Sequence, residues 1–173
     1  MNAPRSHIAL KVTATVVAAA CLVRSPSAGA AAPAEACALL TQAEVSAALG
    51  VAVDAGQPLA PTEKRFCTWH EQGKDPLSGR NVEVNYLTDQ QYERGKVPIE
   101  KVTKTPESGI GDDAYFSKAH GMVSVLSVKK GGTYFRISAR TNPHAFSKSN
   151  TAENDEKDME VDRAVARAIL KKL

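Results

Sequence analysis

Two stretches of the chain alternate between apolar and polar side chains, residues 81–87 and residues 133–140. Such a period of two is typical of a strand with one buried face and one open face. Strand-like composition between turn residues predicts further strands at 51–60, 65–71, 99–105, 114–118 and 122–129. Glycines between the last strands indicate hairpins, so we expect an antiparallel sheet of about five to seven strands.

Helical patterns lie on either side of this strand region. Thr41 and Glu44 form a capping box, and Gly50 offers a left-handed end, which together predict a short helix. Residues 88–94 predict a second short helix, closed by Gly95. We therefore expect an α+β fold, with a short N-terminal helix and a longer C-terminal helix packed on one face of the sheet.

The longer helix is predicted to start near Asn150 or Thr151. Its apolar residues recur at helical spacing, at Val161, Ala164, Val165, Ala168 and Ile169. Acidic residues crowd its first half, at Glu153, Asp155, Glu156, Asp158 and Glu160. Basic residues follow at its end, so each sign stands where the helix dipole favours it, and this charge pattern needs no binding role.

The first thirty residues have the pattern of a secretory signal peptide. Arg5, His7 and Lys11 make a positive start, and the uncharged apolar run 12–23 follows. That run is shorter than the about 20 residues of a membrane-spanning helix, and small residues at 28–30 suit signal peptidase. We expect cleavage after residue 30, with a retained membrane anchor as the alternative.

A second processing route starts from Cys21. Residues 18–21 partly match the lipoprotein pattern, in which this cysteine becomes lipidated, although alanine stands at 18 in place of a large aliphatic residue. A lipidated Cys21 would tether the protein to a membrane without spanning it. The sequence thus predicts a periplasmic or secreted protein, with a membrane-tethered lipoprotein as the alternative.

Processing changes the charge of the protein. The whole chain has 22 Lys and Arg against 19 Asp and Glu. Three basic residues, Arg5, Lys11 and Arg24, belong to the predicted signal peptide, which has no acidic residue, so residues 31–173 are neutral. This balance gives no support to nucleic-acid binding. Residues 31–173 have the size of a single domain with one core.

Cys37 and Cys67 are the cysteine pair that remains after either processing route. Thiols oxidise outside the cytoplasm, so the pair favours a disulfide between the first helix and the strand 65–71. Cys67 and Trp69 have the same parity on that strand, and we expect both to face the core. A free nucleophile or half of a metal site are the alternative interpretations.

Familiar catalytic and metal-binding patterns are missing from the sequence. The histidines of residues 31–173 lie in separate segments without HxH or HExxH spacing, and no nucleophile motif is present. Asp112 and Asp113 are interpreted as turn residues, because neighbours in a strand point to opposite faces. We therefore predict no cofactor, no metal ion and no catalytic residue.

A group of cations and one aromatic residue could form a surface for an anionic ligand or partner. It consists of Lys129, Lys130, Tyr134, Arg136 and Arg140, on and beside the predicted strand 133–140. The alternative is that the lysines are solvated edge residues that discourage strand pairing.

Three short segments occur in a recognisable order: Cys37-Ala38-Leu39-Leu40-Thr41 with the helix to Gly50, then Cys67-Thr68-Trp69, then Gly109-Ile110-Gly111-Asp112-Asp113-Ala114-Tyr115. In this order they resemble a family of exported bacterial domains of unknown function, common among lipoproteins and periplasmic proteins. The resemblance covers most of residues 31–173. It implies an α+β fold with a disulfide between the two cysteines, and it implies no catalytic residues.

The leading hypothesis is a non-enzymatic binding or interaction domain of the cell envelope. Its partner would be an envelope protein or a small anionic ligand, and it would meet a membrane only if Cys21 is lipidated. One rival is an extracytoplasmic hydrolase using scattered polar residues such as His70, Asp112 and His144. Another is a structural accessory protein that acts through an exposed sheet edge.

Overall fold

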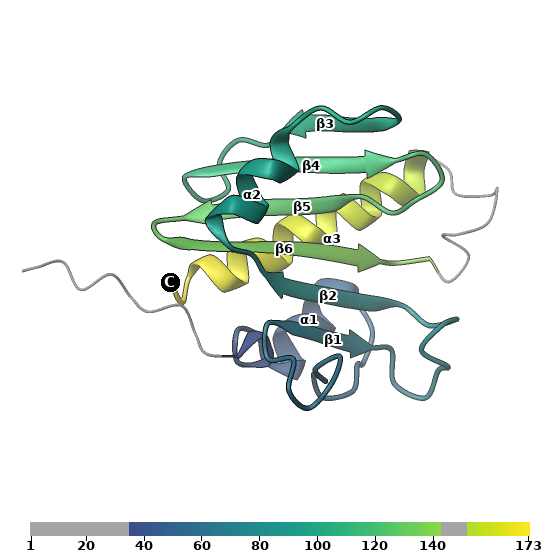
Figure 1. Cartoon of the computed structure of the whole chain (residues 1–173). Coiled ribbons are helices and arrows are strands. Elements are labelled where there is room, and N and C mark those ends of the chain that lie inside the picture. The colour runs from purple at the N-terminus through teal and green to yellow at the C-terminus, as the bar shows by residue number, and fades with distance from the viewer. Residues whose placement is uncertain (1–34, 143–151) are drawn as a thin grey trace, which may run out of the picture.

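A six-stranded antiparallel sheet is the centre of the protein, whose computed structural model describes residues 35–142 and 152–173. The strand order is β1-β2-β6-β5-β4-β3 (Figure 1). The strands are β1 Phe66–His70, β2 Asn81–Tyr86, β3 Val102–Pro106, β4 Asp113–Ala119, β5 Val125–Lys130 and β6 Thr133–Arg140. The predicted α+β class and the expected number of strands are confirmed.

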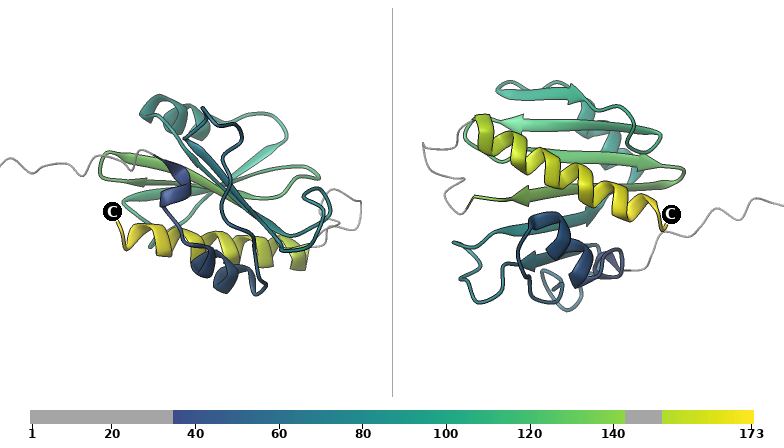
Figure 2. Two further views of the ribbon diagram at one scale, coloured as in Figure 1. Left: turned by 90° about the horizontal axis from the view of Figure 1, so that it is seen from below. Right: turned by 180° about the vertical axis from the view of Figure 1, so that it is seen from behind.

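Helices lie on both faces of this sheet. The short helix α1 (Gln42–Leu49) and the long helix α3 (Ala152–Leu170) pack on one face, as predicted. A third helix, α2 (Asp89–Lys96), crosses the opposite face near one end of the strands (Figures 1 and 2). No other helix of the described ranges lies on that face, and we call it the open face of the sheet.

The core lies between the sheet and the layer formed by α1 and α3. Alternate strand residues point into it, which confirms the predicted core positions of Cys67 and Trp69. The largest buried side chains of the sheet are those of Trp69, Phe135, Leu126, Ile137, Val82 and Val84, each with at most 1% of its surface exposed. Because these residues face the core, the residues between them in sequence face the other way.

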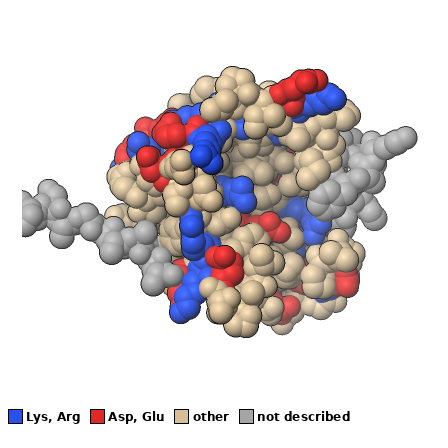
Figure 3. All heavy atoms as spheres, in the orientation of Figure 1, with Lys and Arg blue, Asp and Glu red and all other residues tan. Residues whose placement is uncertain are grey.

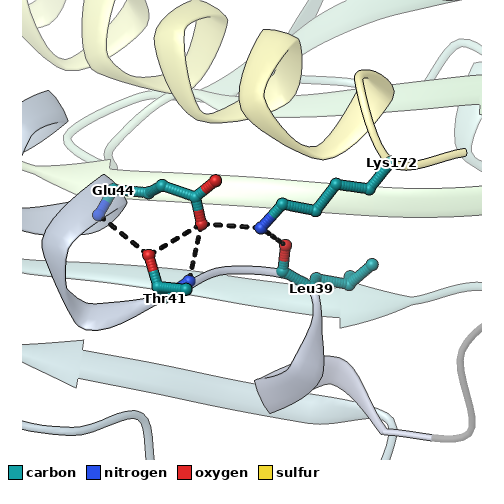
Figure 4. Close-up of polar contacts among 4 residues, drawn as sticks. All are labelled: Leu39, Thr41, Glu44 and Lys172. Atoms are coloured by element: carbon teal, nitrogen blue, oxygen red, sulfur yellow. Dashed lines mark hydrogen bonds and ion pairs between the residues drawn. The ribbon is translucent and has the colours of Figure 1, made fainter.

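Helix α1 is fixed at its start by hydrogen bonds and a crosslink. The capping box is present: Thr41 Oγ1 accepts from the Glu44 backbone N–H, and Glu44 accepts from the Thr41 N–H at 2.7 Å. Lys172 Nζ then donates to Glu44 Oε2 at 2.6 Å and to the Leu39 carbonyl at 2.9 Å (Figure 4). The Sγ atoms of Cys37 and Cys67 lie at disulfide distance, 2.12 Å apart.

Two local predictions need correction. The predicted strand 51–60 is wrong, because this segment forms only two isolated bridges, from Val53 to Glu71 just after β1 and from Gln57 to Thr68 of β1. Pro58 follows at once and has no N–H to continue a ladder. The second short helix does not close at Gly95 but continues to Lys96. Gly95 serves a close approach instead, because a Cβ there would clash with the Tyr115 hydroxyl.

The predicted apolar stripe of the C-terminal helix is partly wrong. Val161, Val165 and Ile169 are buried, but Ala164 is exposed. Asp158, which the sequence analysis assigned only to the acids favoured by the helix dipole, is fully buried together with Asp162. The predicted helix start near residue 150 lies outside the described residues, as do the predicted signal peptide and Cys21.

The two buried carboxyl groups of α3 accept hydrogen bonds from backbone N–H groups that have no partner in the sheet. Asp162 Oδ1 accepts from the Ala139 N–H at 2.7 Å, and Asp158 Oδ1 accepts from the Thr141 N–H at 2.8 Å. The pairing of β5 with β6 ends at Ile137 of β6. The N–H groups of Ala139 and Thr141 therefore have no partner in β5. Burial raises the pKa of both carboxyl groups, and that of Asp162 most strongly.

Candidate functional site

The middle of the open face is built from polar residues of β2 and β6. The two strands pair so that Asn85 lies opposite Arg136, Glu83 opposite Ser138, and Asn81 opposite Arg140. These side chains share the open face because Val82, Val84, Ile137 and Ala139, their neighbours in sequence, are buried in the core. Strand alternation alone therefore gathers two amides, a carboxylate and two guanidinium groups on one surface.

This surface is hollowed into a cavity of about 420 Å³, which we call the hollow. Figure 3 shows it in the centre of the open face, with atoms of both basic and acidic residues inside. A second cavity of about 360 Å³ lies beside α2 and shares Asn85, Ser117, Val125 and Arg136 with the first. Cavities of this size accommodate small ligands.

The walls of the hollow differ in polarity. On the side of β2 and β6 its lining is polar, and Ser117 of β4 adds a hydroxyl group. On the side of β3, β4 and β5 its lining is mostly apolar: Val102, Ala119, Met122, Val123 and Val125. Phe66 of β1 adds an aromatic ring at the opposite margin. A ligand in the hollow would thus meet charged and hydrogen-bonding groups on one side and hydrocarbon on the other.

Arg136 and Glu83 are the charged groups of the hollow that remain unsatisfied. Arg136 is exposed, and neither it nor the half-buried Glu83 makes an ion pair or a side-chain hydrogen bond with any residue that the structure describes. Arg140 differs, because it is buried and its Nη2 donates to the Pro76 carbonyl at 3.0 Å. Arg136 therefore has its full hydrogen-bonding capacity available for a ligand.

Helix α2 closes one end of the open face. Its Tyr92 is fully buried and donates a hydroxyl hydrogen bond to the Asp113 carbonyl at 3.0 Å. The Tyr92 ring also packs at a tilt against two other tyrosine rings. Lys96 of α2 pairs with the Asp113 side chain, which lowers the pKa of that carboxyl group. Among the residues that the structure describes, the cavity beside this helix is lined by the cations Arg94, Lys104 and Arg136 and by no acidic residue.

The five residues suggested as an anion-binding surface separate into three places. Arg136 and Arg140 line the hollow. Lys129 stands over the ring of Tyr134, 5.5 Å from its centroid, and a hydrogen bond with Asp89 raises the pKa of that tyrosine. Lys130 pairs with Asp112 at 2.8 Å beside the β5–β6 turn. The structure thus brings together two of the five.

The residues considered for a hydrolase are not brought together either. Asp112 accepts from Lys130 and from the Gly131 N–H at 2.6 Å, contacts that lower its pKa and match the turn role predicted for it. His70 ends β1, and three strands separate β1 from β4, before which Asp112 lies. His144 lies outside the described residues. Within residues 35–142 and 152–173, no three His, Cys, Asp or Glu residues are grouped as metal ligands.

Sequence reasoning missed Glu83, Asn85 and the apolar wall of the hollow. The alternation of β2 was a sufficient signal for the orientation of Glu83 and Asn85, because it placed them opposite the core residues. The alternation did not predict that Glu83 and Asn85 lie near Arg136, because residues 87–132 separate β2 from β6 in sequence. Their meeting depends on the strand order, in which β6 inserts beside β2.

No family model, curated protein or solved structure matches the chain. A search of the described helices finds none with the length and apolar character needed to cross a bilayer. The arguments about function therefore rest on the residues of the hollow.

Proposed function

We propose that the protein is an exported, non-enzymatic binding domain that holds a small anionic ligand in the hollow. The observation that carries this proposal is the free guanidinium of Arg136. A guanidinium presents several fixed N–H donors, which match the geometry of a carboxylate or a phosphate. Among the residues that line the two connected cavities, four are cationic and one is acidic, which favours an anion.

The polar neighbours of Arg136 support binding more than catalysis. Asn81, Asn85, Ser117 and Ser138 offer hydrogen-bond donors and acceptors, but none is a strong base or an activated nucleophile. The single carboxylate, Glu83, has no histidine, cysteine or second acid beside it in the lining of the hollow. Such a lining can orient and retain a ligand without reacting with it.

The binding proposal is tested with the Arg136→Gln variant of the full chain. Calorimetric titration with 4-methylpentanoate and with phenyl phosphate supplies two anions that carry an apolar group. We expect the variant to bind the preferred anion about tenfold or more weakly, because a charge-assisted hydrogen bond contributes about 1.5–3 kcal/mol. The fold should stay intact, since Arg136 is exposed and makes no contact that Gln would break.

The matched control is Arg167→Gln, which removes an exposed arginine of α3 on the opposite face of the sheet. It lowers the net charge equally but leaves the hollow untouched. Equal affinities for both anions in the wild type and the two variants would refute the hollow as an anion site.

Export and family membership belong to the same proposal. The basic start, the apolar run and the small residues at 28–30 support a cleaved signal peptide, and the pair of cysteines supports an oxidising compartment. The disulfide and the α+β fold also agree with the exported domain family that the chain resembles. Mass spectrometry of the protein from fractionated cells tests processing: a chain starting at residue 31 supports cleavage, an acylated Cys21 supports the lipoprotein route, and an intact residue 1 contradicts both.

A further inference from the structure

Glu83 and Arg136 face the hollow from adjacent strands, in diagonal positions of the β2–β6 ladder. Asn85 lies opposite Arg136, and Glu83 is two residues away from Asn85 on the same side of β2. Diagonal neighbours lie about 7–8 Å apart, with their Cβ atoms somewhat closer, and long side chains can bridge this distance. These two do not form an ion pair within 4.0 Å, and both point toward the same cavity. The hollow therefore presents one free positive and one free negative group side by side.

A ligand with a single negative charge would use only half of this arrangement. Its apolar part would cover Glu83 and remove water from an ionised carboxylate, and desolvation without a partner is costly. A ligand that also carries a positive group would satisfy Glu83 and Arg136 at once. The apolar wall at Val102, Met122 and Val125 lies beside this charged pair and suits a hydrocarbon side chain.

We infer that the ligand of the hollow is a zwitterion with an apolar side chain, of which an apolar α-amino acid is the simplest example. This inference rests on the proposed anion-binding function and adds a second charge to the ligand. The carboxylate accepts hydrogen bonds from the Arg136 guanidinium, and the ammonium group donates to the Glu83 carboxylate. Asn81, Asn85, Ser117 and Ser138 supply further hydrogen bonds, while the side chain contacts the valines of the apolar wall.

Three probes that differ by one charged group test the inference by titration calorimetry on the full chain. L-leucine has both charges, 4-methylpentanoate lacks the ammonium group, and 3-methylbutan-1-amine lacks the carboxylate. We expect L-leucine to bind at least tenfold more tightly than either analogue, because only L-leucine satisfies both charged residues. The Glu83→Gln variant should bind L-leucine about tenfold more weakly and should bind 4-methylpentanoate no less tightly than the wild type does.

Glu160→Gln is the matched control, because Glu160 is an exposed residue of α3 and does not line the hollow. It should leave the affinity for L-leucine unchanged. Far-ultraviolet circular dichroism of both variants shows that a lost affinity does not come from a lost fold.

The outcomes separate this inference from the proposed function. If 4-methylpentanoate binds as tightly as L-leucine and Glu83→Gln changes neither affinity, the zwitterion is refuted while Arg136 remains an anion site. If Arg136→Gln also leaves the affinity for every probe unchanged, anion binding in the hollow is refuted as well, and the inference falls with it. A tenfold preference for L-leucine that Glu83→Gln removes supports both.

Discussion

Removing the buried carboxyl group of Asp162 should lower the free energy of unfolding, because this group accepts a hydrogen bond from buried backbone. Asp162 and Ala139 are both fully buried, and the hydrogen bond between them is 2.7 Å long. In Asp162→Ala the Ala139 N–H loses its acceptor. Strand β5 cannot replace that acceptor, because the pairing of β5 with β6 ends at Ile137 of β6, before Ala139. A buried donor left unsatisfied costs about 1–3 kcal/mol, so we expect the free energy of unfolding to fall by that amount.

Asp162→Asn is the informative companion variant. Its side-chain carbonyl can still accept from the Ala139 N–H, but the amide cannot ionise. Burial raises the pKa of Asp162 well above its ordinary value of 3.8, so the folded protein holds this proton more tightly than the unfolded chain does. The stabilisation that results is fully present below about pH 4 and is lost as the pH rises through the elevated pKa.

The wild type should therefore lose stability relative to Asp162→Asn as the pH rises above about 4. One differentially bound proton corresponds to about 1.4 kcal/mol per pH unit within that window. Asp158 also has a raised pKa and contributes to the pH dependence of both proteins. The contribution of Asp162 is therefore the difference between the free energies of unfolding of the wild type and Asp162→Asn at each pH.

Urea denaturation at several pH values between 4 and 7 measures both effects. The fluorescence of Trp69, the single tryptophan of the chain, follows unfolding because the residue is buried in the core. Parallel stability curves for the wild type and Asp162→Asn would refute the raised pKa. A loss below about 0.5 kcal/mol in Asp162→Ala would refute the role of the Ala139 hydrogen bond.

Two further predictions concern the crosslinks around α1. The double variant Cys37→Ala/Cys67→Ala opens a loop with a sequence separation of 30 residues, and chain entropy predicts that the free energy of unfolding falls by about 3.6 kcal/mol. Urea denaturation measures this loss, and an unchanged midpoint would contradict the prediction. Lys172→Met should cost less than about 1 kcal/mol at neutral pH, because its ion pair with Glu44 is partly exposed. Hydrogen bonds from Lys172 and from Thr41 together lower the Glu44 pKa from 4.5 to about 2, so the loss of the ion pair should be complete above pH 4.5 and should shrink as the pH falls toward 2 in acid titrations of both proteins. A loss that stays constant down to pH 2 would count against the ion pair.

Local patterns in the sequence predicted the elements that depend on nearby residues. The capping box at Thr41 predicted α1, and the alternation from residue 133 to 140 predicted β6 with its bounds, because both signals lie within the element itself. The predicted strand at 51–60 failed because a strand needs a partner along its whole length, and this segment has one at two points only. The local sequence of a segment does not show whether a partner strand accompanies it along its whole length.

The hollow could not be predicted because it depends on distant parts of the chain. Glu83 and Arg136 are separated by more than fifty positions in sequence and meet only because β6 inserts beside β2. The burial of Asp158 was also hidden, since an acidic residue near a helix start normally suits solvent and the helix dipole. Asp158 is buried because it accepts a hydrogen bond from the Thr141 N–H, and this contact depends on the packing of α3 against the end of β6.

The position of β3 at one end of the strand order has a consequence for self-association. Its outer side carries no strand among the described residues, and such edges can template pairing between copies of a protein. The Glu107 N–H bonds to β4, so the nitrogen of the preceding residue, Pro106, faces outward. A proline has no hydrogen to offer there, and the exposed Lys101 adds charge at the other end of the strand. The proline and the charge therefore disfavour the pairing of a second chain with this edge, and so limit self-association through β3.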